Sequence, residues 1–126
     1  MKISRIDHLV LTVADLEQTC RFYQDILGIE VVTFGDGRKA LTFGNQKINL
    51  HLKGREFEPK AARPTPGSAD LCFIADTPID EVVKELEQKG ILTIESKVTR
   101  TGATGSILSV YFRDPDQNLI EISNYI

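Results

Sequence analysis

Three side chains suited to metal chemistry lie in stretches that alternate polar and apolar residues. His8 lies in the run 6–13, and His51 lies in the run 47–53, where its neighbours on either side are leucines. Glu121 stands between two isoleucines near the end of the chain. Because successive side chains of a strand point to opposite faces, each of the three is expected on the polar face of a strand. The apolar neighbours are then free to pack beneath helices.

Imidazole nitrogen and carboxylate oxygen form a ligand set that suits iron, manganese, nickel, cobalt or zinc. Two histidines and one carboxylate leave coordination positions open for a substrate. Each histidine taken alone is more often a hydrogen-bonded core or edge side chain, and a lone Glu121 is more often a solvated sheet residue. The spacing by itself therefore makes a metal site a hypothesis with a structural alternative.

The elements that would position these residues form a pattern in the first half of the chain. After the strand with His8, Asp15 is placed to cap a helix, and Gly28 is placed to end it in a left-handed conformation. Three strand-like runs follow, separated by glycine-containing turns. Their ranges are Glu30–Phe34, Lys39–Phe43 and Lys47–Lys53.

The second half repeats this pattern after a polar, proline-containing stretch. A strand over 69–75 precedes a helix with Thr77 as its expected N-cap, Pro78 in its first position and Gly90 at its end. Further strands are expected around Leu92–Ser96, Ile107–Arg113 and Leu119–Ser123, with a turn over Asp114–Asn118 between the last two.

The spacing of equivalent residues indicates a duplicated module. Asp70 follows His8 by the same number of residues as Gly90 follows Gly28. The fold class predicted is α+β, with two βαβββ modules. We expect a single domain, with module one at about 1–54, a linker at about 55–67 and module two at about 68–126, because each sheet needs the other half to cover its inner face.

Composition places the chain among ordinary globular proteins. It has 126 residues, of which 41% are hydrophobic and 26% charged, and a net charge of −3. No cluster of Lys and Arg favours nucleic acid, and no run has the length of a membrane span or the pattern of a signal peptide. Cys20 and Cys72 show no CxxC spacing. We therefore expect a cytoplasmic protein with reduced thiols and no nucleic-acid or membrane partner.

Several segments of the chain carry a resemblance to a known family. IDHLVLTV, RFYQDILGIEV and FRDPDQNLIEI resemble the first strand, first helix end and last hairpin of the vicinal oxygen chelate superfamily, which contains glyoxalases, bleomycin resistance proteins and dioxygenases. Within it, the chain looks most like glyoxalase domain-containing protein 5 and its bacterial relatives. The resemblance implies paired modules that form an open, cup-shaped mixed β-sheet with helices outside. It also implies one divalent metal ion held by His8, His51, Asp70 and Glu121.

The ligand arrangement differs from that of the better-understood members. Bacterial-type glyoxalase I enzymes usually carry Glu in the place of His51 and His in the place of Asp70. The resemblance implies a metalloenzyme that binds two adjacent oxygens of a small substrate, with Glu121, or Asp70, as catalytic base. It leaves open isomerisation of the lactoylglutathione lyase type and extradiol-type dioxygenase chemistry, and it leaves the metal open among Ni, Zn, Mn, Fe and Co.

Two other functions remain as alternatives. One is a metal-free protein that binds and sequesters small molecules, as bleomycin resistance proteins do, and the other is a regulatory or virulence-associated module that has lost its substrate. Exposed sheet edges favour a homodimer. Further polar candidates for holding a substrate are Arg38, Lys53, Arg63, Arg100 and Tyr111, and the segment Thr99–Gly105 is expected to be a mobile loop.

Overall fold

The computed structural model describes residues 1–126 and divides them into two compact units, residues 1–67 and 68–126. Each unit contains one helix and one four-stranded mixed sheet, so the predicted α+β class with two βαβββ modules is confirmed. That the two units act as a single domain stays a prediction.

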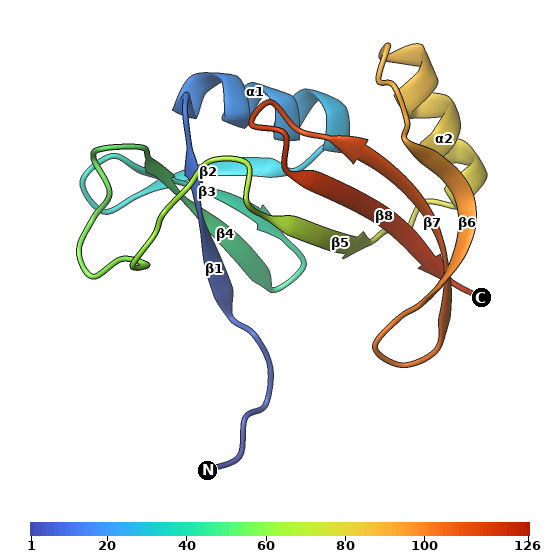
Figure 1. Cartoon of the computed structure of the whole chain (residues 1–126), viewed down its shortest axis with the longest axis horizontal. Helices are drawn as coiled ribbons and strands as arrows, with labels where there is room; N and C mark the ends of the chain where they lie inside the picture. Colours follow the sequence, from blue (N-terminus) through green and yellow to red (C-terminus); the bar gives the residue numbers. More distant parts are fainter. The chain divides into compact units, whose positions relative to one another are not determined.

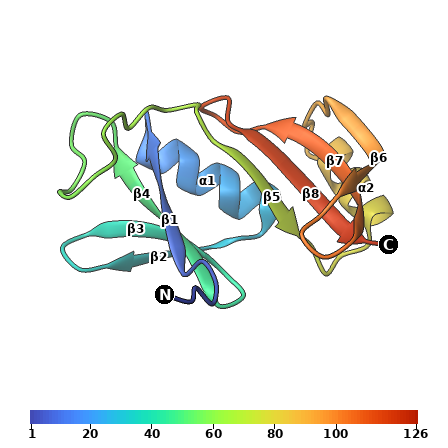
Figure 2. The same cartoon turned by 60° about the horizontal axis from the view of Figure 1, so that its bottom comes forward.

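Unit 1 is a sheet with the strand order β1-β4-β3-β2 (Figures 1 and 2). Strand β1 runs parallel to β4, and the other pairs are antiparallel. The elements are β1 (His8–Val13), α1 (Leu16–Leu27), β2 (Glu30–Phe34), β3 (Arg38–Phe43) and β4 (Gln46–Leu52).

Helix α1 packs on one face of this sheet and leaves the other face to the polar side chains. Tyr23 of the helix and Leu41 of β3 are fully buried, as expected of a core between them. Asp15 accepts a hydrogen bond from the backbone N–H of Gln18 at 3.0 Å, and Gly28 is left-handed with φ 64°. Both predicted helix ends are confirmed.

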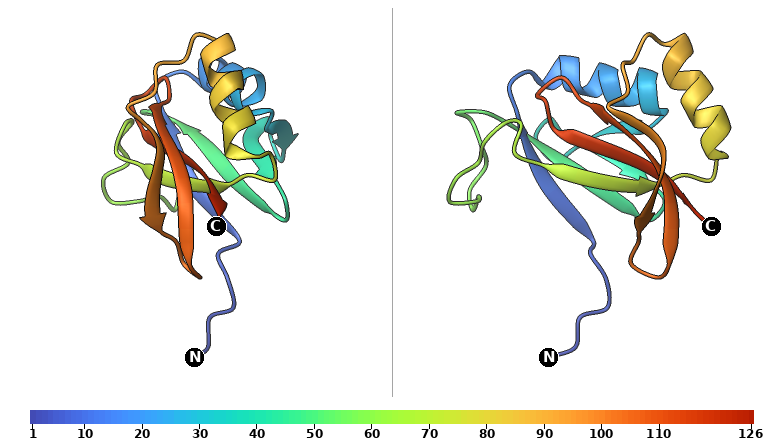
Figure 3. Two further views of the ribbon diagram at one scale, coloured as in Figure 1. Left: turned by 90° about the vertical axis from the view of Figure 1, so that its right-hand side faces the viewer. Right: turned by 45° about the vertical axis from the view of Figure 1, so that its right-hand side comes forward.

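Unit 2 repeats the arrangement with the strand order β5-β8-β7-β6. Its elements are β5 (Asp70–Ile74), α2 (Ile79–Gln88), β6 (Glu95–Thr101), β7 (Ser106–Arg113) and β8 (Leu119–Tyr125). Helix α2 packs on β7 and β8 (Figure 3). Strand β5 pairs in parallel with β8 as β1 does with β4, so the Asp70 strand occupies in its sheet the place of the His8 strand.

Two local predictions for unit 2 were wrong. Strand β6 lies several residues later than expected, because only one of its side chains, Val98, is half-buried and the hydrophobic pattern is weak. In the segment predicted as a mobile loop, residues 99–101 belong to β6 and residues 102–105 form a turn, in which Thr104 N–H donates to the Tyr125 hydroxyl at 3.3 Å; the mobility of this turn stays a prediction. Helix α2 has Pro78, not Thr77, in the N-cap position.

Neither helix of the chain has both the length and the apolar character needed to cross a lipid bilayer.

Candidate functional site

His8 lies at the start of β1 and is exposed. Its Nδ1 lies 2.8 Å from Oδ2 of Asp7, and this contact holds the pKa of the Asp7 carboxyl below its usual value. A carboxylate that binds one ring nitrogen of a histidine fixes the tautomer and leaves the other nitrogen with its lone pair free. The Nε2 atom of His8 is therefore suited to bind a metal ion.

His51 lies on the same face of the sheet but is not level with His8. In the parallel register of β1 and β4, His8 pairs with Lys47, and His51 pairs with Thr12. The offset of four residues corresponds to about 13 Å along the strands. His51 is only 4% exposed, and its ring meets the ring of Phe57 edge-on with centroids 5.6 Å apart.

Asn49 is the position in unit 1 that corresponds to Glu121 in unit 2. Asn49 pairs with Val10, two residues after His8, and Glu121 pairs with Cys72, two residues after Asp70. Sequence reasoning missed Asn49 because it selected the residue type that best binds metal. The constant offset of the duplicated pattern would not have found it, because Glu121 follows Asn49 by 72 residues, whereas Asp70 follows His8 by 62. The residue of β4 that would bind a metal best, His51, is thus not the counterpart of Glu121, which is Asn49.

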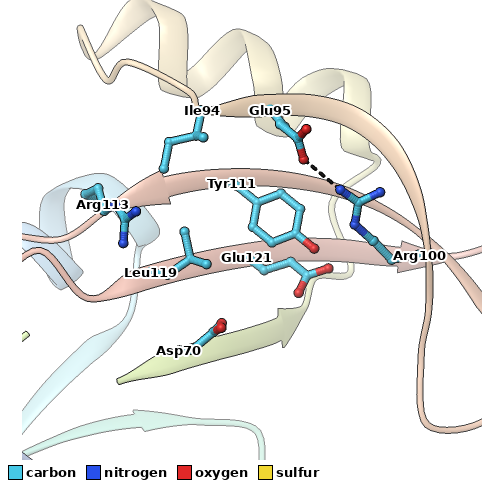
Figure 4. A pocket seen from close by; sticks show the side chains of 8 residues that line it. All are labelled: Asp70, Ile94, Glu95, Arg100, Tyr111, Arg113, Leu119 and Glu121. Atoms are coloured by element: carbon cyan, nitrogen blue, oxygen red, sulfur yellow. Dashed lines mark hydrogen bonds and ion pairs between the residues drawn. The ribbon is translucent and has the colours of Figure 1, made fainter. Parts of the chain in front are cut away.

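An open pocket of about 370 Å³ surrounds Glu121 on the face of the unit 2 sheet opposite α2 (Figure 4). Its lining contains three carboxylates, two guanidinium groups and one phenol. The lining residues are Asp70, Ile94, Glu95, Arg100, Tyr111, Arg113, Leu119 and Glu121. Of the residues predicted from the sequence, this pocket brings together Asp70, Arg100, Tyr111 and Glu121.

Glu121 and Tyr111 are neighbours on paired strands, and the phenol oxygen lies beside the carboxylate (Figure 4). Burial raises the pKa of Tyr111 above its usual value, and a hydrogen bond with Glu121 raises it further. Tyr111 is therefore a protonated donor at neutral pH. The buried Ser123 hydroxyl also donates to Glu121 Oε1, at 3.4 Å, so the carboxylate is oriented from two directions.

Arg100 crosses the end of the pocket. Its Nη2 lies 2.6 Å from Oε2 of Glu95, and its guanidinium carbon lies 5.6 Å from the centroid of the Tyr111 ring. Arg113 lines the same pocket and was missed, although it shares the polar alternation of Tyr111 in β7. Lys53 and Arg63, which were also predicted to hold a substrate, are exposed residues of unit 1.

The family assignment rests on sequence as well as fold. A model of the Glyoxalase/Bleomycin resistance protein/Dioxygenase superfamily matches residues 5–122. The chain belongs to this superfamily. The predicted resemblance to vicinal oxygen chelate proteins is thereby confirmed.

The similar proteins have diverse names. Virulence protein STM3117 of Salmonella typhimurium is 65% identical over 100% of this chain and 88% of its own length, and its crystal structure superposes with a TM-score of 0.98 over 100% of both chains. Glyoxalase domain-containing protein RDO1 of Mycosarcoma maydis is 56% identical over 99% of this chain and 70% of its own length. Lactoylglutathione lyase of Agrobacterium tumefaciens is 26% identical, with a TM-score of 0.75 over 98% of this chain and 95% of that chain.

One protein that shares this fold was solved with a divalent metal. The fosfomycin resistance protein FosX of Listeria monocytogenes was solved with Mn(II) and shares the fold at 21% identity, with a TM-score of 0.68 over 99% of this chain and 93% of that chain.

Proposed function

We propose that this chain is a glyoxalase-like metalloenzyme that acts on a small, oxygen-rich substrate. The pocket around Glu121 carries the proposal, because a carboxylate that can bind a metal or accept a proton lies there beside a phenol and two guanidinium groups. Arg100 and Arg113 suit an anionic or oxygen-rich molecule, since guanidinium groups form short, charge-assisted hydrogen bonds to such oxygens.

The donor chemistry of the chain fits a divalent ion. His8 offers Nε2 while Asp7 holds Nδ1, and Asp70 and Glu121 offer carboxylate oxygens. We propose these three residues as metal ligands, whereas the predicted ligand role of His51 stays a prediction. When bound, such an ion polarises adjacent oxygens of a substrate as a Lewis acid.

The residues of the pocket suggest how a proton would move. Glu121 is the proposed general base, because its carboxylate is half-buried and faces the pocket. The Tyr111 hydroxyl keeps its proton at neutral pH and can donate a hydrogen bond to Glu121 or to a substrate oxygen. Isomerisation of the lactoylglutathione lyase type and ring cleavage of the dioxygenase type would both use this Lewis-acid chemistry, so the proposal covers both.

A metal-free small-molecule binding protein is the second candidate. It is favoured by Asn49, because an amide in the place where unit 2 has Glu121 is a weaker metal ligand. Within unit 1 and within unit 2, no group of three or more His, Cys, Asp or Glu side chains is arranged to hold a metal ion. The two candidates differ in whether ligand binding requires the metal.

Calorimetric titration with acetohydroxamate, which offers two adjacent oxygens, separates the two functions. Protein is first treated with EDTA and then loaded with Ni, Zn, Mn, Fe or Co in turn. A metalloenzyme binds acetohydroxamate only after loading, whereas a metal-free binding protein gives the same result with and without metal. Binding that is independent of metal, or absent with every metal, would contradict the proposal.

Glu121→Gln and Glu87→Gln form a matched pair for this titration. Glu121 faces the pocket, and Glu87 is an exposed residue of α2. We expect Glu121→Gln to weaken metal-dependent binding of acetohydroxamate at least tenfold, which is the lower end of the effect of removing a residue that supports a metal site. Glu87→Gln is expected to behave as the unmodified protein.

A further inference from the structure

Three polar side-chain atoms in unit 1 are buried and have no hydrogen-bond partner: Nε of Arg38, Oδ1 of Asn49 and Nε2 of His51. Buried polar atoms are nearly always paired, so each exception needs an explanation. Asn49 is 6% exposed and His51 is 4% exposed. None of the three lies in the pocket around Glu121.

The three residues lie together on one face of the unit 1 sheet. Lys39 pairs with Leu50 and Ala40 pairs with Asn49 in the antiparallel register of β3 and β4, so Arg38 is level with His51. Side chains that are level on neighbouring strands share a face and lie about 5 Å apart at Cβ. Asn49 is two residues from His51 and therefore on the same face. The unpaired atoms thus form one cluster.

Arg38 is a positive charge without a carboxylate partner. Its guanidinium carbon lies 5.0 Å from the centroid of the Phe34 ring and 4.4 Å from that of Phe57, and it forms no ion pair. Aromatic rings bind the faces of a guanidinium group and leave its N–H edge available. That edge matches a carboxylate, which accepts two parallel hydrogen bonds from it.

No carboxylate of unit 1 fills this role. Glu56 acts on the charge state of His51, but both of its oxygens accept hydrogen bonds from the Gly54 N–H, at 2.8 and 3.0 Å. A neutral ring can donate through Nε2 without adding a second buried charge.

We propose that Arg38 and His51 form a carboxylate-binding subsite on the β3–β4 face of unit 1. The Nε–H of Arg38 and the Nε2–H of His51 donate to the carboxylate. Asn49 Oδ1 accepts from a hydroxyl group next to it, so a 2-hydroxy acid satisfies all three atoms. Phe57 covers the subsite. Its ring is 43% exposed and lies in a segment without helix or strand, so it can move aside when the ligand enters.

This subsite goes beyond the proposed function, needs no metal ion, and assigns His51 to the carboxylate instead of to the metal. Its test therefore uses EDTA-treated protein, in which the proposed metal site does not contribute. Failure of carboxylate binding leaves the metal proposal standing, and failure of metal binding leaves this proposal standing.

Titration with lactate, acetate and inorganic phosphate, followed by NMR of the His51 ring and the Asn49 side-chain amide, tests the subsite. We expect saturable shifts with lactate and acetate, and binding of lactate about two- to tenfold tighter, as one added hydrogen bond predicts. Asn49→Ala should remove the advantage of lactate and leave acetate binding. Tighter binding of phosphate than of either carboxylate would contradict the ligand class.

Arg38→Lys, Arg38→Gln and Arg21→Gln provide the matched variants. Arg38→Lys keeps the charge but replaces the fixed Nε–H of the planar guanidinium group by a flexible ammonium group, so it should weaken acetate binding at least fivefold, and Arg38→Gln should weaken it further. Arg21 is an exposed residue of α1 paired with Glu17, and its variant should bind as the unmodified protein does. Unchanged binding in both Arg38 variants, or shifts that grow linearly with every anion, would overturn the proposal. If Arg38→Gln does not fold, Arg38→Lys decides.

Discussion

At the scale of single residues, the Asn118 side chain connects three parts of unit 2. Its Oδ1 accepts from the Ala69 N–H at 2.9 Å, and its Nδ2 donates to Oδ2 of Asp114 at 2.8 Å. Asn118→Ala leaves buried groups unpaired and should lower the free energy of unfolding by about 2–3 kcal/mol. Urea unfolding measures this. Asn45→Ala, at an exposed turn, is the control and should change it by less than about 0.5 kcal/mol. Equal effects of the two substitutions would contradict the role assigned to Asn118.

Cys20 gives a residue-scale prediction for pH. Burial raises the pKa of its thiol above the ordinary value of 9.0, and Lys39 opposes this only in part. Because the thiolate is the reactive form, a Cys72→Ser protein should react with iodoacetamide more slowly than free cysteine at pH 8, and the rate should still be rising above pH 9. A rate that levels off below pH 9 would show a lowered pKa and contradict the expectation.

At the scale of elements, the sequence predicted most helices and strands because their hydrophobic periodicity is strong. Strand β2 was predicted with the bounds that it has, and both ends of α1 were marked by Asp15 and Gly28. Strand β6 was misplaced because it buries little. The side chain that caps α2 could not be predicted from the sequence around the helix, because it belongs to Asn124 of β8. Its Oδ1 accepts a hydrogen bond from the Ile79 N–H at 2.7 Å.

Asn124 is therefore expected to stabilise α2 from a distant part of the chain. Its Nδ2 also donates to the backbone oxygens of Ala75 and Thr77, both at 3.0 Å. Asn124→Ala should cost about 1–3 kcal/mol in the free energy of unfolding, since buried backbone groups lose their partner. Hydrogen exchange should show faster opening at the start of α2. Gln88→Ala, at the exposed end of the helix, is the control. If exchange at the start of α2 is no faster in Asn124→Ala than in Gln88→Ala, the role assigned to Asn124 is refuted.

At the scale of the whole molecule, duplication relates the candidate site residues of the two halves. The repeated pattern pointed to equivalent positions in the two halves, and the structure confirms Asp70 as the counterpart of His8. His51 was chosen by chemistry, whereas the register makes Asn49 the counterpart of Glu121. The unpaired buried atoms near Arg38 follow from packing and could not be predicted from residue types.

Assembly is a further prediction at this scale. We propose a homodimer, because β1 and β5 are edge strands of their sheets and expose the apolar side chains Val10 and Ile74. Analytical ultracentrifugation should give a mass twice the 14.1 kDa of the chain. A mass of 14.1 kDa at micromolar concentration would contradict this.

We propose that the chain holds one divalent metal ion through residues that include His8 and Glu121. Elemental analysis of protein purified without added metal tests this proposal. We expect about one divalent ion per chain, lost in His8→Ala and in Glu121→Gln, with circular dichroism spectra unchanged. Protein without metal that also fails to bind added Ni, Zn, Mn, Fe or Co, or full metal content in both variants, would contradict it.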